Sequence, residues 1–196
     1  MKNIDLWQGH NVYKGRAVQQ KKTVYTYFVH LLEQVKPTRI VEIGSGHGGL
    51  TLFLRNITFP EVEFFSFETH DFEWNRELKD KGVIFSNENI FENNNSIFTL
   101  KDEFKHLFER NNTLILCDGG YKIGEFNCLA DYTKPGDLIL AHDYCTDRAK
   151  FEELLVWNWL EIEYSNIKDA CERNNLKPYM EEDSLANAWG CFKRES

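Results

Sequence analysis

The sequence predicts a Rossmann-like, doubly wound α/β fold built on a mainly parallel seven-stranded sheet. Short apolar segments alternate with segments of helical periodicity along most of the chain. Continuous apolar runs at 114–116 and 138–140 suit parallel strands that are covered on both faces. A glycine-rich turn at 44–49 joins the first of these strands to a helical stretch. Together these observations indicate βαβ units with right-handed crossovers.

The first predicted element is a helix over residues 18–35. Its apolar side chains, among them Val24, Phe28 and Leu31, recur at helical spacing. Pro37 ends it, because the residue before a proline is disfavoured in the α conformation. We expect residues 1–36 to form an N-terminal helical segment that packs on a core domain of residues 37–196, within one globular unit of 196 residues.

Strand and helix signals alternate from residue 39 onward. Asn95 and Ser96 are both suitable N-caps for the helix that follows them. Pro135 and Gly136 indicate a turn into the fifth strand. The expected elements are strand 39–43, helix 50–55, strand 63–67, helix 71–81, strand 83–85, a helix from 95 or 96 to 110, strand 113–117, helix 123–132 and strand 137–141.

The C-terminal part interrupts this alternation. Residues 151–159 are apolar and aromatic, and residues 165–174 predict a helix. A short strand at 176–180 and a returning strand at 187–193 would bring the sheet to seven strands.

Charge and cysteine content restrict the class of protein. The chain has 23 Lys and Arg against 31 Asp and Glu, a formal charge of −8, and no dense basic run, which argues against a nucleic-acid partner. Its five cysteines are dispersed and odd in number, as is typical of reduced thiols in a cytosolic protein. The sequence shows neither an apolar signal segment nor a run long enough to cross a membrane. We therefore expect a cytoplasmic protein without a membrane partner.

The glycine loop after the first strand allows two interpretations. Its spacing Gly44-x-Gly46-x-x-Gly49 matches the dinucleotide fingerprint. The pattern Glu42-x-Gly44-x-Gly46-x-Gly48 resembles motif I of class I S-adenosylmethionine (SAM) methyltransferases. Glu42 favours the second interpretation, because a carboxylate at the end of the strand suits the cationic amino-acid end of SAM and would repel a pyrophosphate.

Two further positions are candidates for cofactor binding. Glu68 ends the second strand, 24 residues after Gly44, where an acidic side chain accepts hydrogen bonds from ribose hydroxyls. Asn89 follows the third strand, where a polar side chain can contact the adenine edge. A solvated loop position explains either residue as an alternative. With Ser45 inside the loop, the predicted cofactor-binding residues are Glu42, Gly44, Ser45, Gly46, Gly48, Glu68, Asn89 and Asp118.

The ends of the fourth and fifth strands carry the candidate chemistry. Asp118 follows one strand, and His142 with Asp143 ends the other, so the two segments should meet at one edge of the sheet. Two carboxylates and an imidazole are compatible with a divalent cation such as Mg²⁺ or Mn²⁺, which would lower the pKa of an acceptor hydroxyl. Lys122 is an alternative general base. Structural roles compete with these: Asp118 could cap the next helix, and His142 could be a core histidine.

Separated segments of the chain resemble one family. Residues 35–49, VKPTRIVEIGSGHGG, are similar to the opening of class I methyltransferases related to the cephalosporin hydroxylase and rhamnosyl O-methyltransferase group. Residues 116–122, LCDGGYK, and 141–144, AHDY, resemble that group's fourth- and fifth-strand motifs. Trp7-Gln8-Gly9, with a glutamine at 19 or 20, resembles its N-terminal segment, so that the likeness extends over about residues 5–145.

The resemblance implies a Rossmann-like fold, SAM as methyl donor and, in many members, a divalent metal held after strands four and five. Carried over to this chain, the ligands would be Asp118 and Asp143, with His142 at a position that is more often acidic. Members of the group act on hydroxyls of sugars, antibiotics and other small polar molecules.

The sequence thus predicts a SAM-dependent methyltransferase that methylates an oxygen of a small molecule or glycan, with metal assistance. Its predicted catalytic residues are Asp118, Lys122, His142 and Asp143. Two alternatives stay open: an NAD-dependent oxidoreductase, and a non-catalytic partner subunit with the same fold. The sequence leaves a homo-oligomer open as well.

Overall fold

A seven-stranded sheet forms the centre of the protein in the computed structural model, which describes residues 11–70, 75–94 and 97–196. The strand order is β12-β13-β9-β8-β3-β4-β5. Among these seven strands, β13 runs antiparallel to the other six. This confirms the predicted mainly parallel sheet. The strands are β3 (Arg39–Ile43), β4 (Glu63–Phe67), β5 (Val83–Ser86), β8 (Thr113–Cys117), β9 (Leu138–His142), β12 (Leu176–Pro178) and β13 (Trp189–Arg194).

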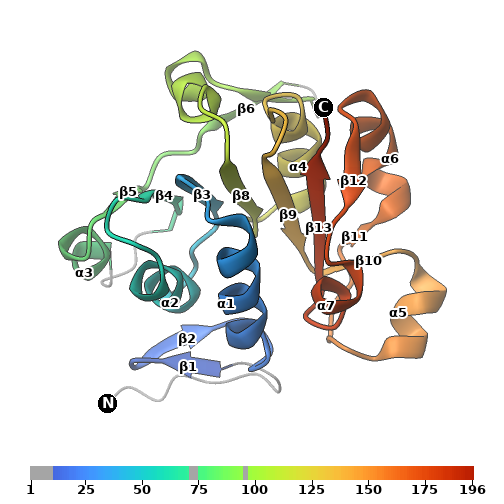
Figure 1. The fold of residues 1–196 in the computed structure, drawn as a ribbon, viewed down its shortest axis with the longest axis horizontal. Coiled ribbons are helices and arrows are strands. Elements are labelled where there is room, and N and C mark those ends of the chain that lie inside the picture. The colour runs from blue at the N-terminus through green and yellow to red at the C-terminus, as the bar shows by residue number, and fades with distance from the viewer. Residues whose placement is uncertain (1–10, 71–74, 95–96) are drawn as a thin grey trace.

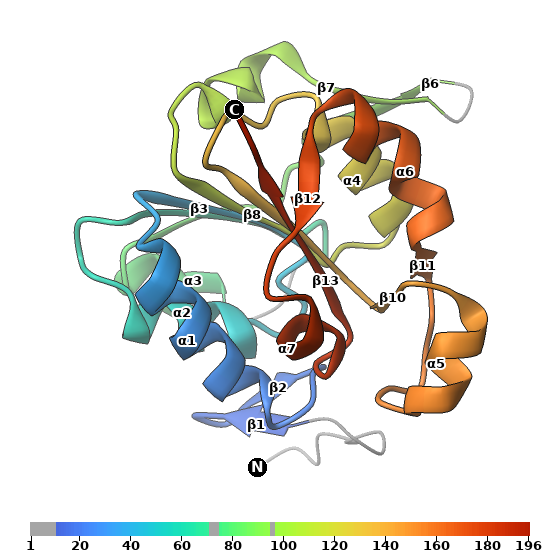
Figure 2. The same ribbon diagram turned by 45° about the vertical axis from the view of Figure 1, so that its right-hand side comes forward.

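Helices cover both faces of the sheet (Figures 1 and 2). In Figure 2, α1 (Val24–Val35), α2 (Gly49–Ile57) and α3 (Asn75–Asp80) lie on one side, and α4 (Lys122–Ala130) and α6 (Tyr164–Arg173) lie on the other. The shorter helices are α5 (Arg148–Leu154), α7 (Glu181–Leu185) and the 3₁₀ helix η1 (Asp102–Phe108). No described helix is both long and apolar enough to span a bilayer.

The apolar strands contribute side chains to two separate cores. In β3, Ile40 packs with the α1 and α2 side chains, whereas Val41 packs with Phe126 and Ile167 on the opposite face. Successive side chains of a strand point to opposite faces, so a strand buried on both sides is mostly apolar. This explains the continuous apolar runs in the sequence.

The segment before α1 differs from the prediction. The helix expected from residue 18 begins at Val24, and a hairpin of β1 (Asn11–Tyr13) and β2 (Arg16–Val18) precedes it. Lys14 and Gly15 form its two-residue turn, and both have positive φ, as tight hairpin turns require. The division at residue 36 stays a prediction, and residues 1–10, including the segment at Trp7, lie outside the described part.

The helix predicted from Asn95 or Ser96 to residue 110 is wrong. Residues 91–94 and 97–100 pair instead as the antiparallel strands β6 (Phe91–Asn94) and β7 (Ile97–Leu100), and η1 follows. Ile97, Phe98 and Thr99 are β-branched or aromatic and favour strands. The cap positions themselves, 95 and 96, lie outside the described residues, as do 71–74 at the start of the helix predicted over 71–81.

The C-terminal elements confirm the predicted completion of the sheet. Strand β13 inserts between β9 and β12, and α6 covers the sheet beside α4. Between β9 and α6, a short parallel pair, β10 (Tyr144–Cys145) and β11 (Ile162–Glu163), encloses α5 and the aromatic segment that follows it.

Candidate functional site

A cavity of about 690 Å³ opens at the carboxyl ends of the parallel strands. It lies where the chain order reverses, because β3 has β4 on one side and β8 on the other. Ligands of open α/β sheets bind at such a switch point. Every predicted cofactor and catalytic residue except Gly48 lines this cavity.

The glycine loop approaches the end of β8 too closely for a side chain. Gly44, Gly46 and Gly48 have φ angles of +83°, +49° and +71°. A Cβ at Gly44 would lie 2.3 Å from the carbonyl oxygen of Asp118. The first glycine is therefore required both by its backbone conformation and by the contact between the loop and the neighbouring strand.

Glu42 is a buried carboxylate without a basic partner among the described residues. Both of its hydrogen bonds go to one oxygen, Oε2, from the hydroxyls of Thr51 and Ser66, each at 2.7 Å. Burial raises the pKa of Glu42 to about 7, although these two hydroxyls act in the opposite direction. Because Glu42 lines the cavity, a bound cation would stabilise its charged form.

Glu68 and Ser45 also present polar atoms at the cofactor side of the cavity. Glu68 Oε2 accepts a hydrogen bond from the Gly46 amide at 2.8 Å, and Oε1 accepts one from the His70 amide at 3.0 Å. The Ser45 hydroxyl is buried with no hydrogen-bond partner in the described structure. Asn89 is exposed at the rim, where its Oδ1 accepts a hydrogen bond from the Phe91 amide.

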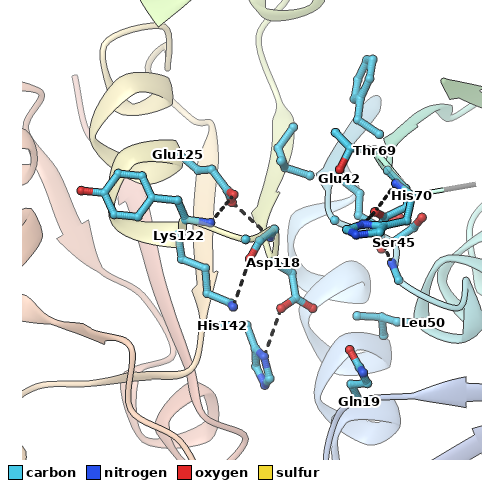
Figure 3. A pocket seen from close by; sticks show the side chains of 18 of the residues that line it. Gln19, Glu42, Ser45, Leu50, Thr69, His70, Asp118, Lys122, Glu125 and His142 are labelled. Atoms are coloured by element: carbon cyan, nitrogen blue, oxygen red, sulfur yellow. Dashed lines mark hydrogen bonds and ion pairs between the residues drawn. The ribbon is translucent and has the colours of Figure 1, made fainter. Parts of the chain in front are cut away.

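Asp118 lies at the centre of the site, between the glycine-loop residues and Lys122 (Figure 3). Its Oδ2 accepts a hydrogen bond from Gln20 Nε2 at 2.8 Å, and its Oδ1 lies 3.1 Å from His142 Nδ1. The side chain keeps 18% of its surface exposed to the cavity. His142 is buried beside Trp157 and Trp189, and its Nε2 has no partner among the described residues. We therefore assign the ring proton of His142 to Nδ1, which faces the carboxylates of Asp118 and Asp143.

Asp143 and Lys122 form a buried ion pair on the other side of His142. Lys122 Nζ lies 3.1 Å from Asp143 Oδ2 and 2.9 Å from Glu161 Oε2, and it donates to the Gly119 carbonyl at 3.1 Å. Burial acts to lower the pKa of Lys122, but the charges of Asp118 and Asp143 and the contact with Glu161 outweigh it and raise the pKa. This direction keeps Lys122 protonated, which argues against its predicted role as a general base.

The backbone at Asp143 is unusual for a residue with a side chain. Its φ is +56°, in the left-handed region, and Trp157 Nε1 donates to its Oδ1 at 2.6 Å. Non-glycine residues adopt this conformation where the surrounding contacts determine it. The ion pair with Lys122 and the indole bond therefore hold the carboxylate in one place.

Several residues of the site were not predicted from the sequence. Glu125 accepts hydrogen bonds from the amides of Gly119 and Tyr121, each at 3.1 Å, and burial raises its pKa to about 7. Glu125 lies four residues after Tyr121 in the first turn of α4, which is the one sequence signal for this role. Gln20, Trp157 and Glu161 reach the site from distant parts of the chain, and no local pattern marks them as partners of Asp118 or Lys122.

Carboxylates dominate the charge of the cavity. Lys122 is the only lysine or arginine among the described residues that line it. The lining carboxylates are Glu42, Glu68, Glu88, Asp118, Glu125, Asp143 and Glu161. A cavity of this composition attracts cationic ligands and repels a pyrophosphate.

The predicted metal ligands lie together but do not form a metal site. Each of the four carboxylate oxygens of Asp118 and Asp143 lies within 3.1 Å of a nitrogen atom of another side chain. In the described ranges, no three His, Cys, Asp or Glu side chains are arranged to hold one metal ion. The donor set therefore does not fit the divalent cation expected from the sequence.

The cofactor side does fit SAM. At Gly46 a Cβ would meet only Gln19 Oε1, at 3.6 Å, so the loop leaves space beside its backbone there. Glu42 offers a carboxylate without a positive partner, and a ligand can supply the hydrogen-bond partner that the Ser45 hydroxyl lacks. The chain holds these groups around one cavity.

Comparison with solved structures shows the same fold in methyltransferases. A structure of CmcI with Mg and SAM matches with a TM-score of 0.63 and 15% identity, over 95% of this chain and 77% of that one. A CmcI structure with S-adenosylhomocysteine (SAH) matches with a TM-score of 0.60 and 12% identity, over 99% and 87%. The ribosomal protein L11 methylase of Lactobacillus delbrueckii subsp. bulgaricus matches with a TM-score of 0.53 and 10% identity, over 93% and 83%.

These matches confirm the predicted class I methyltransferase fold. No protein-family model matches the sequence, and comparison with curated proteins gives no match either. At 10–15% identity the structural likeness establishes the architecture alone. The reaction and its acceptor must therefore be argued from the site.

Proposed function

We propose that this protein is a SAM-dependent methyltransferase. The observation that carries the proposal is Glu42, a buried carboxylate beside the glycine loop that has no basic partner in the described structure. The amino group of SAM would supply the missing positive charge through a charge-assisted hydrogen bond. The methyltransferase fold of the structural neighbours, two of them CmcI structures with SAM or SAH, supports the same conclusion.

The remaining cofactor contacts follow from the position of each group around the cavity. The glycine loop at 44–47 would lie against the ligand, and Ser45 Oγ would form a hydrogen bond with it. Glu68 would accept hydrogen bonds from the ribose hydroxyls, and Asn89 at the rim would contact the adenine edge.

On the acceptor side, we propose oxygen methylation of a small polar molecule or a glycan hydroxyl. SAM supplies a methyl group on a sulfonium, so the protein has to align an acceptor oxygen and receive its proton. Asp118 retains lone pairs that face the cavity and would accept the hydrogen bond of the acceptor hydroxyl. Asp118 would then hold the proton of the acceptor hydroxyl. His142 Nδ1, 3.1 Å from Asp118 Oδ1, would stabilise the protonated pair of Asp118 and His142.

A protein from Klebsiella pneumoniae that is provisionally assigned as an O-methyltransferase supports oxygen as the methylated atom. It matches with a TM-score of 0.55 and 12% identity, over 89% of this chain and 81% of that one. The L11 methylase shares the fold as well, so the choice of acceptor depends on Asp118 and its surroundings.

An NAD-dependent oxidoreductase is less consistent with the site. NAD binding would place a pyrophosphate at the glycine loop, close to Glu42 and Glu68, and the described lining residues of that side include no lysine or arginine to neutralise it. A non-catalytic partner subunit would not need the hydrogen-bonded set of Asp118, His142 and Gln20.

Isothermal titration calorimetry with SAM, SAH and NAD tests the proposal. We expect SAM and SAH to bind and NAD not to bind. Glu42→Gln should weaken SAM binding by about tenfold, which corresponds to ~1.4 kcal/mol, whereas Glu33→Gln on the exposed side of α1 should leave it unchanged. Binding of NAD in preference to SAM, or full affinity for SAM in Glu42→Gln, would contradict it.

A further inference from the structure

We propose that Lys122 supplies, as a fixed ammonium group, the positive charge that a divalent cation would otherwise bring to Asp118 and Asp143, so that the acceptor side operates without a metal. This inference rests on the proposed function, since it concerns how that site is charged. It also separates this chain from the CmcI structure with Mg and SAM, whose fold it shares.

Each carboxylate oxygen of Asp118 and Asp143 already contacts a nitrogen of the protein. Asp118 Oδ2 has Gln20 Nε2 at 2.8 Å, and Asp118 Oδ1 has His142 Nδ1 at 3.1 Å. Asp143 Oδ1 has Trp157 Nε1 at 2.6 Å, and Asp143 Oδ2 has Lys122 Nζ at 3.1 Å. Mg²⁺ requires near-ideal octahedral oxygen ligation, so a cation would have to displace several of these contacts at once.

Lys122 is held in place by its own contacts. Its ammonium has three donors, and the structure gives it three acceptors: Asp143 Oδ2, Glu161 Oε2 and the Gly119 carbonyl. The side chain is buried and starts from the first turn of α4, which follows Asp118 directly. The charge therefore cannot move away to admit a cation without leaving its own hydrogen bonds unmade.

Charge repulsion by Lys122 also disfavours a divalent cation at this place. A divalent ion bound by Asp143 would lie close to the ammonium that contacts the same carboxylate, and two like charges at this separation repel strongly in a buried site. Loss of the ammonium has the opposite effect. Without it, Asp118, Asp143 and Glu161 would form an acidic group with no lysine or arginine among the described lining residues to balance it.

Removing the charge of Lys122 should allow a divalent metal ion to bind at Asp118 and Asp143 in place of the ammonium group. Lys122→Met keeps an unbranched side chain, one atom shorter than lysine, and removes its charge. We expect this variant to bind Mn²⁺ at least about tenfold more tightly than the wild-type protein, since the freed carboxylates are hard oxygen ligands. Lys150→Met is the matched control, because Lys150 is paired with Glu153 on the outer surface of α5, away from the cavity.

The experiment is a titration with Mn²⁺, followed by electron paramagnetic resonance, and thermal denaturation of the same samples. Mn²⁺ should raise the Tm of Lys122→Met by several degrees, while the wild type and Lys150→Met should shift by less than about 1 °C. Stoichiometric Mn²⁺ binding by the wild type that Asp143→Asn abolishes would overturn the inference, whether or not Lys122→Met folds. Equal Mn²⁺ affinity in Lys122→Met and the wild type would overturn it as well.

Calorimetry with SAM, in EDTA and without it, separates this inference from the proposed function. If SAM binds equally in both conditions and the wild type does not bind Mn²⁺, the result supports both the proposed function and the metal inference. If SAM binds and the wild type also binds Mn²⁺ through Asp143, the metal inference alone fails. If SAM does not bind in either condition, the proposed function fails, and with it this inference about its acceptor side.

Discussion

Gln20 Nε2 donates a hydrogen bond to Asp118 Oδ2 across 2.8 Å, although 98 residues separate the two in the sequence. The same amide accepts a hydrogen bond from Trp189 Nε1 at 3.0 Å through its Oε1. Gln20 is buried between β2 and α1, so one side chain connects the N-terminal hairpin, the end of β8 and the start of β13. It is a positioning residue for the carboxylate at the centre of the site.

Gln20→Leu should therefore misplace Asp118, which loses one hydrogen bond, and leave the buried Trp189 Nε1 without its partner. We expect a loss of about 1–3 kcal/mol in the free energy of unfolding, measured by urea denaturation. Methyl transfer should slow while the Kd for SAM stays within about twofold, because Gln20 acts on the acceptor side. Gln19→Leu, at an exposed neighbouring position, should keep its stability. An unchanged free energy of unfolding for Gln20→Leu would show that this hydrogen bond contributes nothing.

The affinity for SAM should depend on pH through Glu42. Its pKa is raised to about 7, so near pH 6 most molecules have to lose a proton before the carboxylate can pair with a cation. We expect the affinity to rise as the pH increases from 6 to 7.5, by up to about tenfold. Calorimetry over this range checks the slope, which Glu42→Gln should flatten. A falling affinity over the same range would contradict the assigned role.

Glu125 should make the protein less stable as the pH rises. Its pKa is about 7 in the folded state against 4.5 for an ordinary glutamate, so the folded state binds the proton more tightly. Stability should therefore decrease between about pH 4.5 and pH 7 and level off above, with Glu42 contributing in the same direction. Glu125→Gln should reduce this slope by up to about 1.4 kcal/mol per pH unit.

Chemical denaturation at pH 5, 6, 7 and 8 measures that slope. Glu152→Gln, which changes an exposed carboxylate on α5, is the control and should follow the wild type. If Glu125→Gln also follows the wild type at every pH, the buried carboxylate is not the source of the slope.

Two glycines allow a steric effect to be separated from a backbone effect. Gly44 and Gly82 have nearly equal φ angles of +83° and +78°. A Cβ at Gly44 would collide with the Asp118 backbone, whereas a Cβ at Gly82 would have nothing within 4 Å. Gly82→Ala should cost about 1–2 kcal/mol from its backbone conformation alone. Gly44→Ala should cost about 1–3 kcal/mol more and abolish SAM binding. Equal effects of the two changes on stability would argue against the close contact.

The core of the fold could be predicted because its signals are local. Strands β3, β8 and β9 are buried and mostly apolar, and the glycine loop has a distinctive spacing. The hairpin at 11–18 lacked such a signal, since its turn is Lys14-Gly15 and not one of the common pairs with asparagine or aspartate. The prediction of a helix over β7 is wrong because the strand depends on ring contacts of Phe98 with Phe91 and Tyr121, 7 and 23 residues away in the sequence, which no local pattern shows.

The position of the site residues could be predicted from the sequence, but their partners could not. The rule that ligands bind at the carboxyl ends of strands places Asp118, His142 and Asp143 together, and the structure confirms this arrangement. What the rule cannot provide is the partner of each carboxylate. Lys122 precedes Glu161 by 39 residues, and only the folded chain shows that they meet and leave little room for a metal.

The insertion of β13 between β9 and β12 has a consequence for shortened versions of this protein. An edge strand can be trimmed at modest cost, but β13 hydrogen-bonds on both sides. Deleting residues 189–194 would leave one edge of β9 (Leu138–His142) unpaired along its full length. The free amides and carbonyls of this mostly apolar strand could then pair with a strand of another molecule. Such a variant should precipitate, and fusions at the C-terminal end should leave these six residues untouched.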